Sequence, residues 1–69
     1  MNMKTENYQK LKEQLRTIKE IEDAYMPMLA KGEEPLIDGL DYREALFEQA
    51  GVLIAVLEDV LQDEEDHLN

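Results

Sequence analysis

The stretch EQAGVLIAVLEDVLQDEED, residues 48–66, joins six consecutive apolar residues, Val52 to Leu57, to an almost unbroken acidic run. Apolar residues at helical spacing extend this pattern, which predicts a helix from about residue 41 to 66. On a helical wheel the central apolar stripe holds Leu46, Ala50, Leu53, Leu57, Val60 and Leu61, with Phe47 and Ile54 on one flank and Val52 and Val56 on the other. The resulting arc is roughly 200° wide, about twice the stripe of a helix that faces one neighbouring layer. A single neighbouring helix therefore covers only part of it.

The start of this helix carries a capping signal. Asp41 is followed three residues later by Glu44, which is the spacing of a capping box with Asp in place of Ser or Thr. Leu40 and Ala45 occupy the flanking hydrophobic positions. We therefore predict that the helix begins at about residue 41.

An earlier helix is predicted over about residues 5–26. Its apolar residues recur in steps of three and four and form a narrow seam: Tyr8, Leu11, Leu15, Ile18, Ile21, Tyr25 and Met28 or Leu29. Thr5 is a candidate N-cap. Pro27 ends or kinks the helix, because proline lacks the backbone N–H and clashes with the preceding turn. Alternatively, a last turn continues to residue 30, with Gly32 as the terminating residue.

Residues 31–40 contain two glycines and a proline and are predicted to form a loop, with Asp38–Gly39 as a turn dipeptide. Two helices joined by a short loop form an antiparallel hairpin. We therefore predict one all-α domain over residues 1–69 that ends in an acidic tail, residues 63–69.

The size of the chain indicates that the hairpin does not stand alone. A core in a chain of 69 residues rarely supplies more than about 3–5 kcal/mol of stability, and the chain has no cysteine for disulfides and one histidine. We predict that a second copy completes the fold as a homodimeric four-helix bundle. The predicted interface lies on the wide apolar arc and consists of Leu46, Phe47, Ala50, Leu53, Ile54, Val56, Leu57 and Leu61.

Charge divides the chain into two unlike halves. Residues 1–31 carry six Lys and Arg against five acidic residues, whereas residues 32–69 carry Arg43 alone against twelve acidic residues. Such a field repels nucleic acid and anionic membranes and attracts basic surfaces. The N-terminus lacks the apolar centre of a signal peptide, and the longest apolar run is far shorter than a bilayer span. We therefore expect a cytoplasmic protein that binds neither nucleic acid nor membrane directly.

The chain lacks a complete catalytic or metal-binding motif. Glu64-x-x-His67 has the spacing of a di-iron helix pair, but it lies in a polar tail rather than among apolar neighbours. Glu20-x-x-Asp23 is the carboxylate spacing of helical pyrophosphatases, but the second helix has no matching pair in its body. Catalytic Ser and Cys and the phosphate-binding glycine motifs are absent. We expect no enzymatic activity, no cofactor and no metal.

The remaining feature is the acidic surface, which predicts a protein that binds a basic partner protein and inhibits or regulates it. The carboxylates would occupy a nucleic-acid-binding groove in place of phosphates. Small, acidic, cysteine-free hairpins of this type are common among bacterial and phage regulatory proteins. The acidic residues expected to bind are Glu58, Asp59, Asp63, Glu64, Glu65 and Asp66, with Glu33 and Glu34 in the loop. Alternatively, the chain is a structural or assembly element that acts through its wide apolar helix face.

Overall fold

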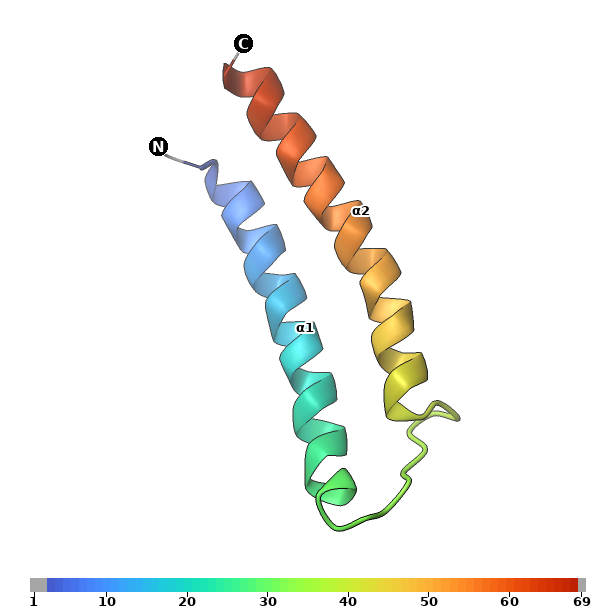
Figure 1. Cartoon of the computed structure of the whole chain (residues 1–69). Helices are drawn as coiled ribbons and strands as arrows, with labels where there is room; N and C mark the ends of the chain where they lie inside the picture. Colours follow the sequence, from blue (N-terminus) through green and yellow to red (C-terminus); the bar gives the residue numbers. More distant parts are fainter. Residues whose placement is uncertain (1–2, 69) are drawn as a thin grey trace.

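The computed structural model describes residues 3–68, and the side chains of residues 3–66. Helix α1 spans Thr5–Leu29 and helix α2 spans Tyr42–Leu68. The two helices run antiparallel, with the loop at one end and both termini at the other (Figure 1). The molecule measures 51 × 18 × 15 Å. Within the described residues there is no strand beyond one isolated bridge between Ile37 and Leu40, so the predicted all-α hairpin is confirmed.

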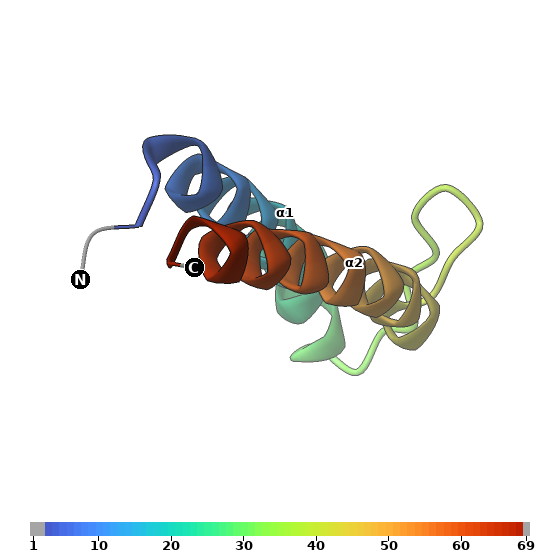
Figure 2. The same cartoon turned by 90° about the horizontal axis from the view of Figure 1, so that it is seen from above.

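Viewed from above, α1 and α2 lie side by side in one layer, and the loop projects beyond α2 (Figure 2). A single layer of two helices buries only the line along which they meet. In the described part of the chain, no further element covers either broad side of this layer.

The N-cap and the last residue of helix α1 differ from those predicted. Lys4 occupies the N-cap and no side chain caps the helix, so the expectation that Thr5 is the cap is wrong: Thr5 is already helical. Pro27 lies inside α1 and the helix continues to Leu29. Proline lacks the backbone N–H that would donate to the carbonyl of Asp23, so α1 continues past Pro27 with one internal hydrogen bond fewer, close to the alternative that extends the helix to residue 30.

The end of α1 is a Schellman motif. The backbone N–H of Glu33 donates to the carbonyl of Met28 at 3.0 Å, and the N–H of Gly32 donates to the carbonyl of Leu29, also at 3.0 Å. Gly32 has φ +80°, the left-handed conformation that this motif requires and that glycine adopts without a steric penalty. Gly32 is therefore the residue that turns the chain out of the helix.

The loop and the start of α2 follow the predicted turn and capping signals. Ile37 and Leu40 exchange two backbone hydrogen bonds of 3.0 Å around Asp38 and Gly39, which both have positive φ, as in a type I′ turn. At the start of α2, the N–H of Glu44 donates to Asp41 Oδ1 at 2.8 Å, and the N–H of Asp41 donates to Glu44 Oε1 at 3.2 Å. The capping box is therefore confirmed.

The core lies along the line between the helices. Its buried apolar residues are Tyr25, Ala45 and Val60. The hydroxyl of Tyr25 donates to the carbonyl of Leu40 at 2.6 Å, and its ring lies 5.5 Å from that of Tyr42. These contacts tie the end of α1 to the loop and to the start of α2.

The rotation of α1 differs from the predicted seam. Asn7 and Gln14 are buried against α2, whereas Tyr8 and Leu15, each one position further along the helix, are both 53% exposed. The inward line of α1 therefore consists of Asn7, Leu11, Gln14, Ile18, Ile21 and Tyr25. The polar residues are tolerated there because α2 presents polar partners at the same levels.

Candidate interaction surfaces

One broad side of the hairpin is apolar. An α-helix advances about 100° per residue, so each residue that directly follows an inward-facing one points to the side of the layer. Because the two right-handed helices are antiparallel, these following residues lie on the same side of both helices. We call this surface the apolar face; its apolar residues are Tyr8, Leu15 and Met26 of α1 with Phe47, Ala50, Ile54, Leu57 and Leu61 of α2. On α1 these alternate with Lys12, Lys19 and Glu22, which lie on the same side.

The apolar face is open to solvent in the hairpin. Phe47 is 81% exposed, Leu61 59% and Ile54 57%. Contiguous apolar surface of this kind is uncommon on monomeric soluble proteins and marks sites of association.

The structure divides the predicted oligomer interface into two lines. Leu46, Leu53 and Val56 are half-buried on the stripe of α2 that faces α1. The other five residues of that prediction lie on the apolar face: Phe47, Ala50, Ile54, Leu57 and Leu61. The wide arc is thus covered by α1 along one line and left open along the other.

At the open end of the hairpin, two of the predicted docking acids bond to α1. The side-chain amide of Asn7 donates to Asp63 Oδ2 at 2.8 Å and to Glu64 Oε2 at 2.6 Å. Lys4 donates from Nζ to Asp63 Oδ1 and from its backbone N–H to Glu64 Oε2, both at 3.2 Å. The hydrogen bond from Asn7, followed by that from Lys4, lowers the pKa of Asp63 below its usual range.

This arrangement also has an electrostatic reason. Carboxylates near the C-terminus of α2 are unfavourable for the dipole of their own helix, but here they lie at the positive N-terminus of α1. Asp63 and Glu64 therefore hold the two helix ends together: both oxygens of Asp63 and the Oε2 atom of Glu64 accept hydrogen bonds from Lys4 and Asn7. Asn7 is 1% exposed, and its Oδ1 atom accepts no hydrogen bond from the described residues.

A third predicted acid, Asp59, bonds to Lys10 of α1. Lys10 Nζ donates to Asp59 Oδ2 at 2.7 Å. This hydrogen bond, with the attraction of the Asp59 charge, raises the pKa of Lys10. Both side chains are largely exposed, so the pair fixes the register of the helices more than it stabilises them.

The outer surface of α2 carries exposed carboxylates near both ends of the helix, separated by the exposed residues Gly51, Val52 and Ala55. We call these carboxylates the acidic ridge: Glu44 and Glu48 near the start of α2, and Glu58, Asp59, Glu65 and Asp66 near its end, with Asp59 on the edge that bonds to Lys10 of α1. Between Glu44 and Asp66 the chain contains no lysine or arginine. The loop residues Glu33 and Glu34 are exposed at the opposite end of the hairpin from the tail (Figure 1). The structure therefore places the predicted docking acids in three locations: the ridge, the contact with α1 and the loop.

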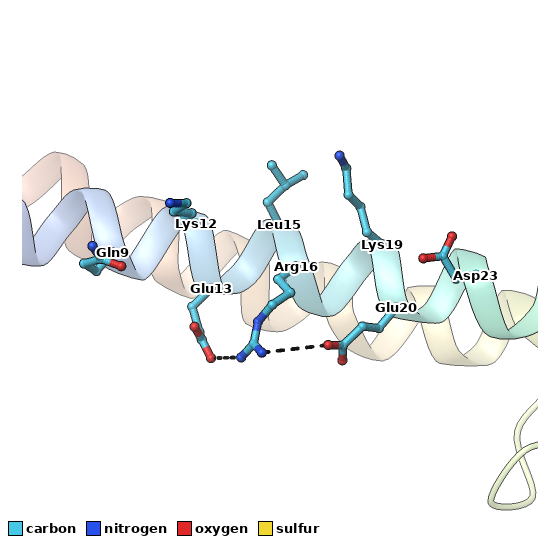
Figure 3. A pocket seen from close by; sticks show the side chains of 8 residues that line it. All are labelled: Gln9, Lys12, Glu13, Leu15, Arg16, Lys19, Glu20 and Asp23. Carbon is cyan, nitrogen blue, oxygen red and sulfur yellow. Dashed lines mark hydrogen bonds and ion pairs between the residues drawn. The ribbon is translucent and has the colours of Figure 1, made fainter.

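The outer surface of α1 has a different character (Figure 3). It is a shallow hollow along a single helix, lined by Gln9, Lys12, Glu13, Leu15, Arg16, Lys19, Glu20 and Asp23. Arg16 pairs with Glu13 and, at 4.0 Å, with Glu20. Three basic and three acidic side chains balance here, and all of them project from one helix into solvent. This surface has neither the net charge nor the enclosure that a ligand site needs.

Sequence reasoning missed the polar residues that hold the helices together. Asn7, Leu11, Gln14, Ile18, Ile21 and Tyr25 follow steps of four and three without a break. This heptad line was visible in the sequence, but two of its members are polar and were assigned to the solvated face.

Comparison of the chain with protein-family models, with curated proteins and with solved structures gives no match. Among the described residues, no group of three or more His, Asp or Glu side chains is arranged to hold a metal ion. Glu64, one half of the di-iron spacing considered above, bonds to Asn7, and the side chain of His67 lies outside the described part. Neither described helix is long and apolar enough to cross a bilayer.

Proposed function

We propose that the protein is a small non-enzymatic acidic protein that binds a basic partner protein and inhibits or regulates it. The observation that carries this proposal is the acidic ridge, two groups of exposed carboxylates near the ends of α2 without a basic residue among them. A surface made only for solubility mixes both signs of charge, as the outer surface of α1 does. The ridge instead repels itself, and that electrostatic cost is offset when a basic surface docks on it.

The ridge, rather than the whole tail, is the docking surface of this proposal. Asp63 and Glu64 already accept hydrogen bonds from Asn7 and Lys4, so they contribute to the field but have little capacity left for a partner. Glu33 and Glu34 are secondary contacts because they lie at the other end of the hairpin. Carboxylates without basic neighbours suit a groove that binds the phosphates of a nucleic acid, and the partner class of this proposal is therefore a nucleic-acid-binding protein.

Binding to a panel of basic nucleic-acid-binding proteins, measured at low and high salt, tests this proposal. The ridge variant combines Glu48→Lys, Glu58→Lys, Glu65→Lys and Asp66→Lys. The matched control makes the same change in net charge on α1, with Glu13→Lys, Glu20→Lys, Glu22→Lys and Asp23→Lys.

We expect the unmodified protein to bind at least one panel member, to displace its nucleic acid, and to lose affinity steeply as salt is added. The ridge variant should lose this binding, whereas the control retains most of it. Equal loss in both variants would mean that only net charge matters, and binding that is insensitive to salt would contradict the proposal.

A second candidate function is that of an assembly element, and the exposure of Phe47, Ile54 and Leu61 on the apolar face favours it. In that case Leu57→Asp abolishes function while the ridge variant leaves it intact. Leu57 is suited to this test because it is 40% exposed, whereas Leu53 faces α1 and its substitution would unfold the hairpin.

A further inference from the structure

We propose that the apolar face is covered by the same face of a second copy, packed antiparallel about a two-fold axis at the level of Ile54 and Leu15. The proposal concerns the apolar face; of the acidic ridge only Glu58 and Glu65 enter it, through the orientation of the two copies. It rests on the surface area of the hairpin, the spacing of the apolar residues and the placement of charge.

The hairpin exposes more surface than a folded chain of its mass normally does. Its accessible surface is 5560 Å², whereas a typical folded monomer of 8.0 kDa exposes about 4,450 Å². The excess is about 1,100 Å², and a standard protein–protein interface buries about 800 Å² on each partner. One further copy on one broad side of the layer would therefore remove most of the excess.

The apolar residues of α2 are spaced symmetrically about Ile54. Phe47 and Leu61 lie seven residues before and after it, and Ala50 and Leu57 lie four before and three after. A two-fold axis through Ile54, perpendicular to the helices, therefore packs Ile54 against its own copy and Phe47 against Leu61 of the second copy.

Helix α1 shares the same centre. Two contacts between the helices bracket the register: counting from Lys10–Asp59 brings Leu15 level with Ile54, and counting from Gln14–Gln49 brings it level with Glu48. Tyr8 is level with Leu61 by the first of these counts. One axis therefore serves both helices, with α2 packed on α2 and α1 on α1.

On α2, charge favours the antiparallel orientation, whereas on α1 the same axis brings Lys12 of one copy near Lys19 of the other. Arg43, which makes no ion pair within the described residues, lies eleven residues before Ile54, and Glu65 lies eleven after it. The two-fold axis thus brings Arg43 of one copy to Glu65 of the second copy, twice in the dimer. In a parallel arrangement Glu58 and Glu65 would instead meet their own copies, and the two helix dipoles would also be aligned.

This packing has a consequence for the acidic ridge. Because α2 packs on α2, the two ridges lie on the same side of the dimer and form one acidic surface of double width. Their mutual repulsion weakens the dimer, and salt screens that repulsion. We therefore expect dimerisation to tighten as salt is added, opposite to the salt dependence of partner binding.

Single cysteine variants test the proposal directly, because the chain has no cysteine of its own. The variants are Ile54→Cys, Phe47→Cys and Leu61→Cys on the apolar face, Leu15→Cys on α1, and Ala55→Cys as the control. Ala55 is exposed, directly follows Ile54 and points away from the apolar face. Each variant is oxidised mildly at low concentration and analysed by non-reducing electrophoresis, after circular dichroism of the reduced form has shown unchanged helix content.

We expect Ile54→Cys to form a disulfide with itself. Phe47→Cys and Leu61→Cys should each remain single chains but cross-link when mixed, and Ala55→Cys should remain a single chain. Self-linking of both Phe47→Cys and Leu61→Cys would overturn the proposal in favour of a parallel dimer. Preferential linking of Leu15→Cys to Ile54→Cys would overturn it in favour of α1 stacked on α2.

Light scattering on the unmodified protein keeps the test decisive if a variant fails to fold. A mass of two chains supports the proposal, and a mass of one chain at all concentrations overturns it. Neither result bears on the acidic ridge, so failure here and failure of the proposed function are separate outcomes.

Discussion

Replacing Phe47 by alanine separates the stability of the hairpin from that of its association. Phe47 is 81% exposed in the hairpin, and in the antiparallel dimer it packs against Leu61 of the second copy. Full burial of a Phe side chain stabilises by about 1.5–3 kcal/mol, so the exposed part contributes about 1.2–2.4 kcal/mol per copy on association. The two copies together lose about 2.4–4.9 kcal/mol, which raises the dissociation constant of the dimer by about 50-fold to 3,000-fold.

This substitution should change the stability of the hairpin itself only slightly. The part of Phe47 that is already buried contributes about 0.3–0.6 kcal/mol, and the better helix propensity of alanine offsets much of it. Sedimentation equilibrium across a dilution series measures the dissociation constant, and circular dichroism checks the helix content. Val52→Ala is the control, because Val52 is 46% exposed but lies on the other side of α2. If Phe47→Ala weakens the dimer no more than Val52→Ala does, the apolar face is not the dimer interface.

Three further substitutions test the hairpin. Gly51→Ala should stabilise α2 by up to about 1 kcal/mol in a thermal melt, because glycine in the middle of a helix is destabilising relative to alanine. The added Cβ meets no atom within 4 Å. Unchanged or lower stability would contradict this open site. Asp63 has a lowered pKa, so it stabilises the hairpin above its ordinary pKa of about 3.9 and this contribution is lost as the pH falls through its lower folded pKa. The Asp63→Asn variant should therefore lose stability less steeply below about pH 4 than the unmodified protein; parallel curves would mean that the contact with Asn7 does not form. Tyr25→Phe keeps the ring and removes the hydrogen bond to the carbonyl of Leu40, which still accepts from the N–H of Ile37. The free energy of unfolding in urea should therefore fall by about 0.5–1.5 kcal/mol. An unchanged free energy of unfolding would contradict the hydrogen bond.

The hairpin was predictable because the signals that start and end its helices lie close together in the sequence. Asp41 and Glu44 form a capping box within four residues, and Gly32 and Asp38–Gly39 supply the positive φ angles that end α1 and turn the loop. Each of these signals depends only on near neighbours in the chain. The sequence alone was therefore enough to indicate two helices and their antiparallel arrangement.

The rotation of α1 was not predictable from its apolar residues. Tyr8 and Leu15 recur seven residues apart, as Asn7 and Gln14 do, and they are apolar. The hydrophobic pattern therefore favours them, although the steps of four and three are unbroken only through Asn7 and Gln14. The choice depends on Asp63, Glu64 and Gln49, which lie far along the chain and accept the side-chain hydrogen bonds of Asn7 and Gln14. In the hairpin, Asn7 and Gln14 face these partners, and Tyr8 and Leu15 are left exposed.

The positions of the acidic residues were likewise only partly predictable from the sequence. Their number and sign were evident in the sequence, and six of them form the outer ridge of α2. That Asp63 and Glu64 turn inward depends on the N-terminus of α1 lying beside the end of α2. The apolar residues of α2 form two adjacent lines, one that faces α1 and one that is open to solvent. These two lines explain why the apolar arc of α2 is about twice as wide as packing against one helix requires.

The most direct test of the proposed dimer is the mass of the unmodified protein in solution. Light scattering behind size exclusion, across a concentration series at low and high salt, gives this mass directly. We expect two chains, with a dissociation constant that decreases as salt is added, because burial of the apolar face drives association while the acidic ridges oppose it. A cooperatively folded single chain at every concentration and salt level would contradict the dimer and leave the apolar face open for a different partner.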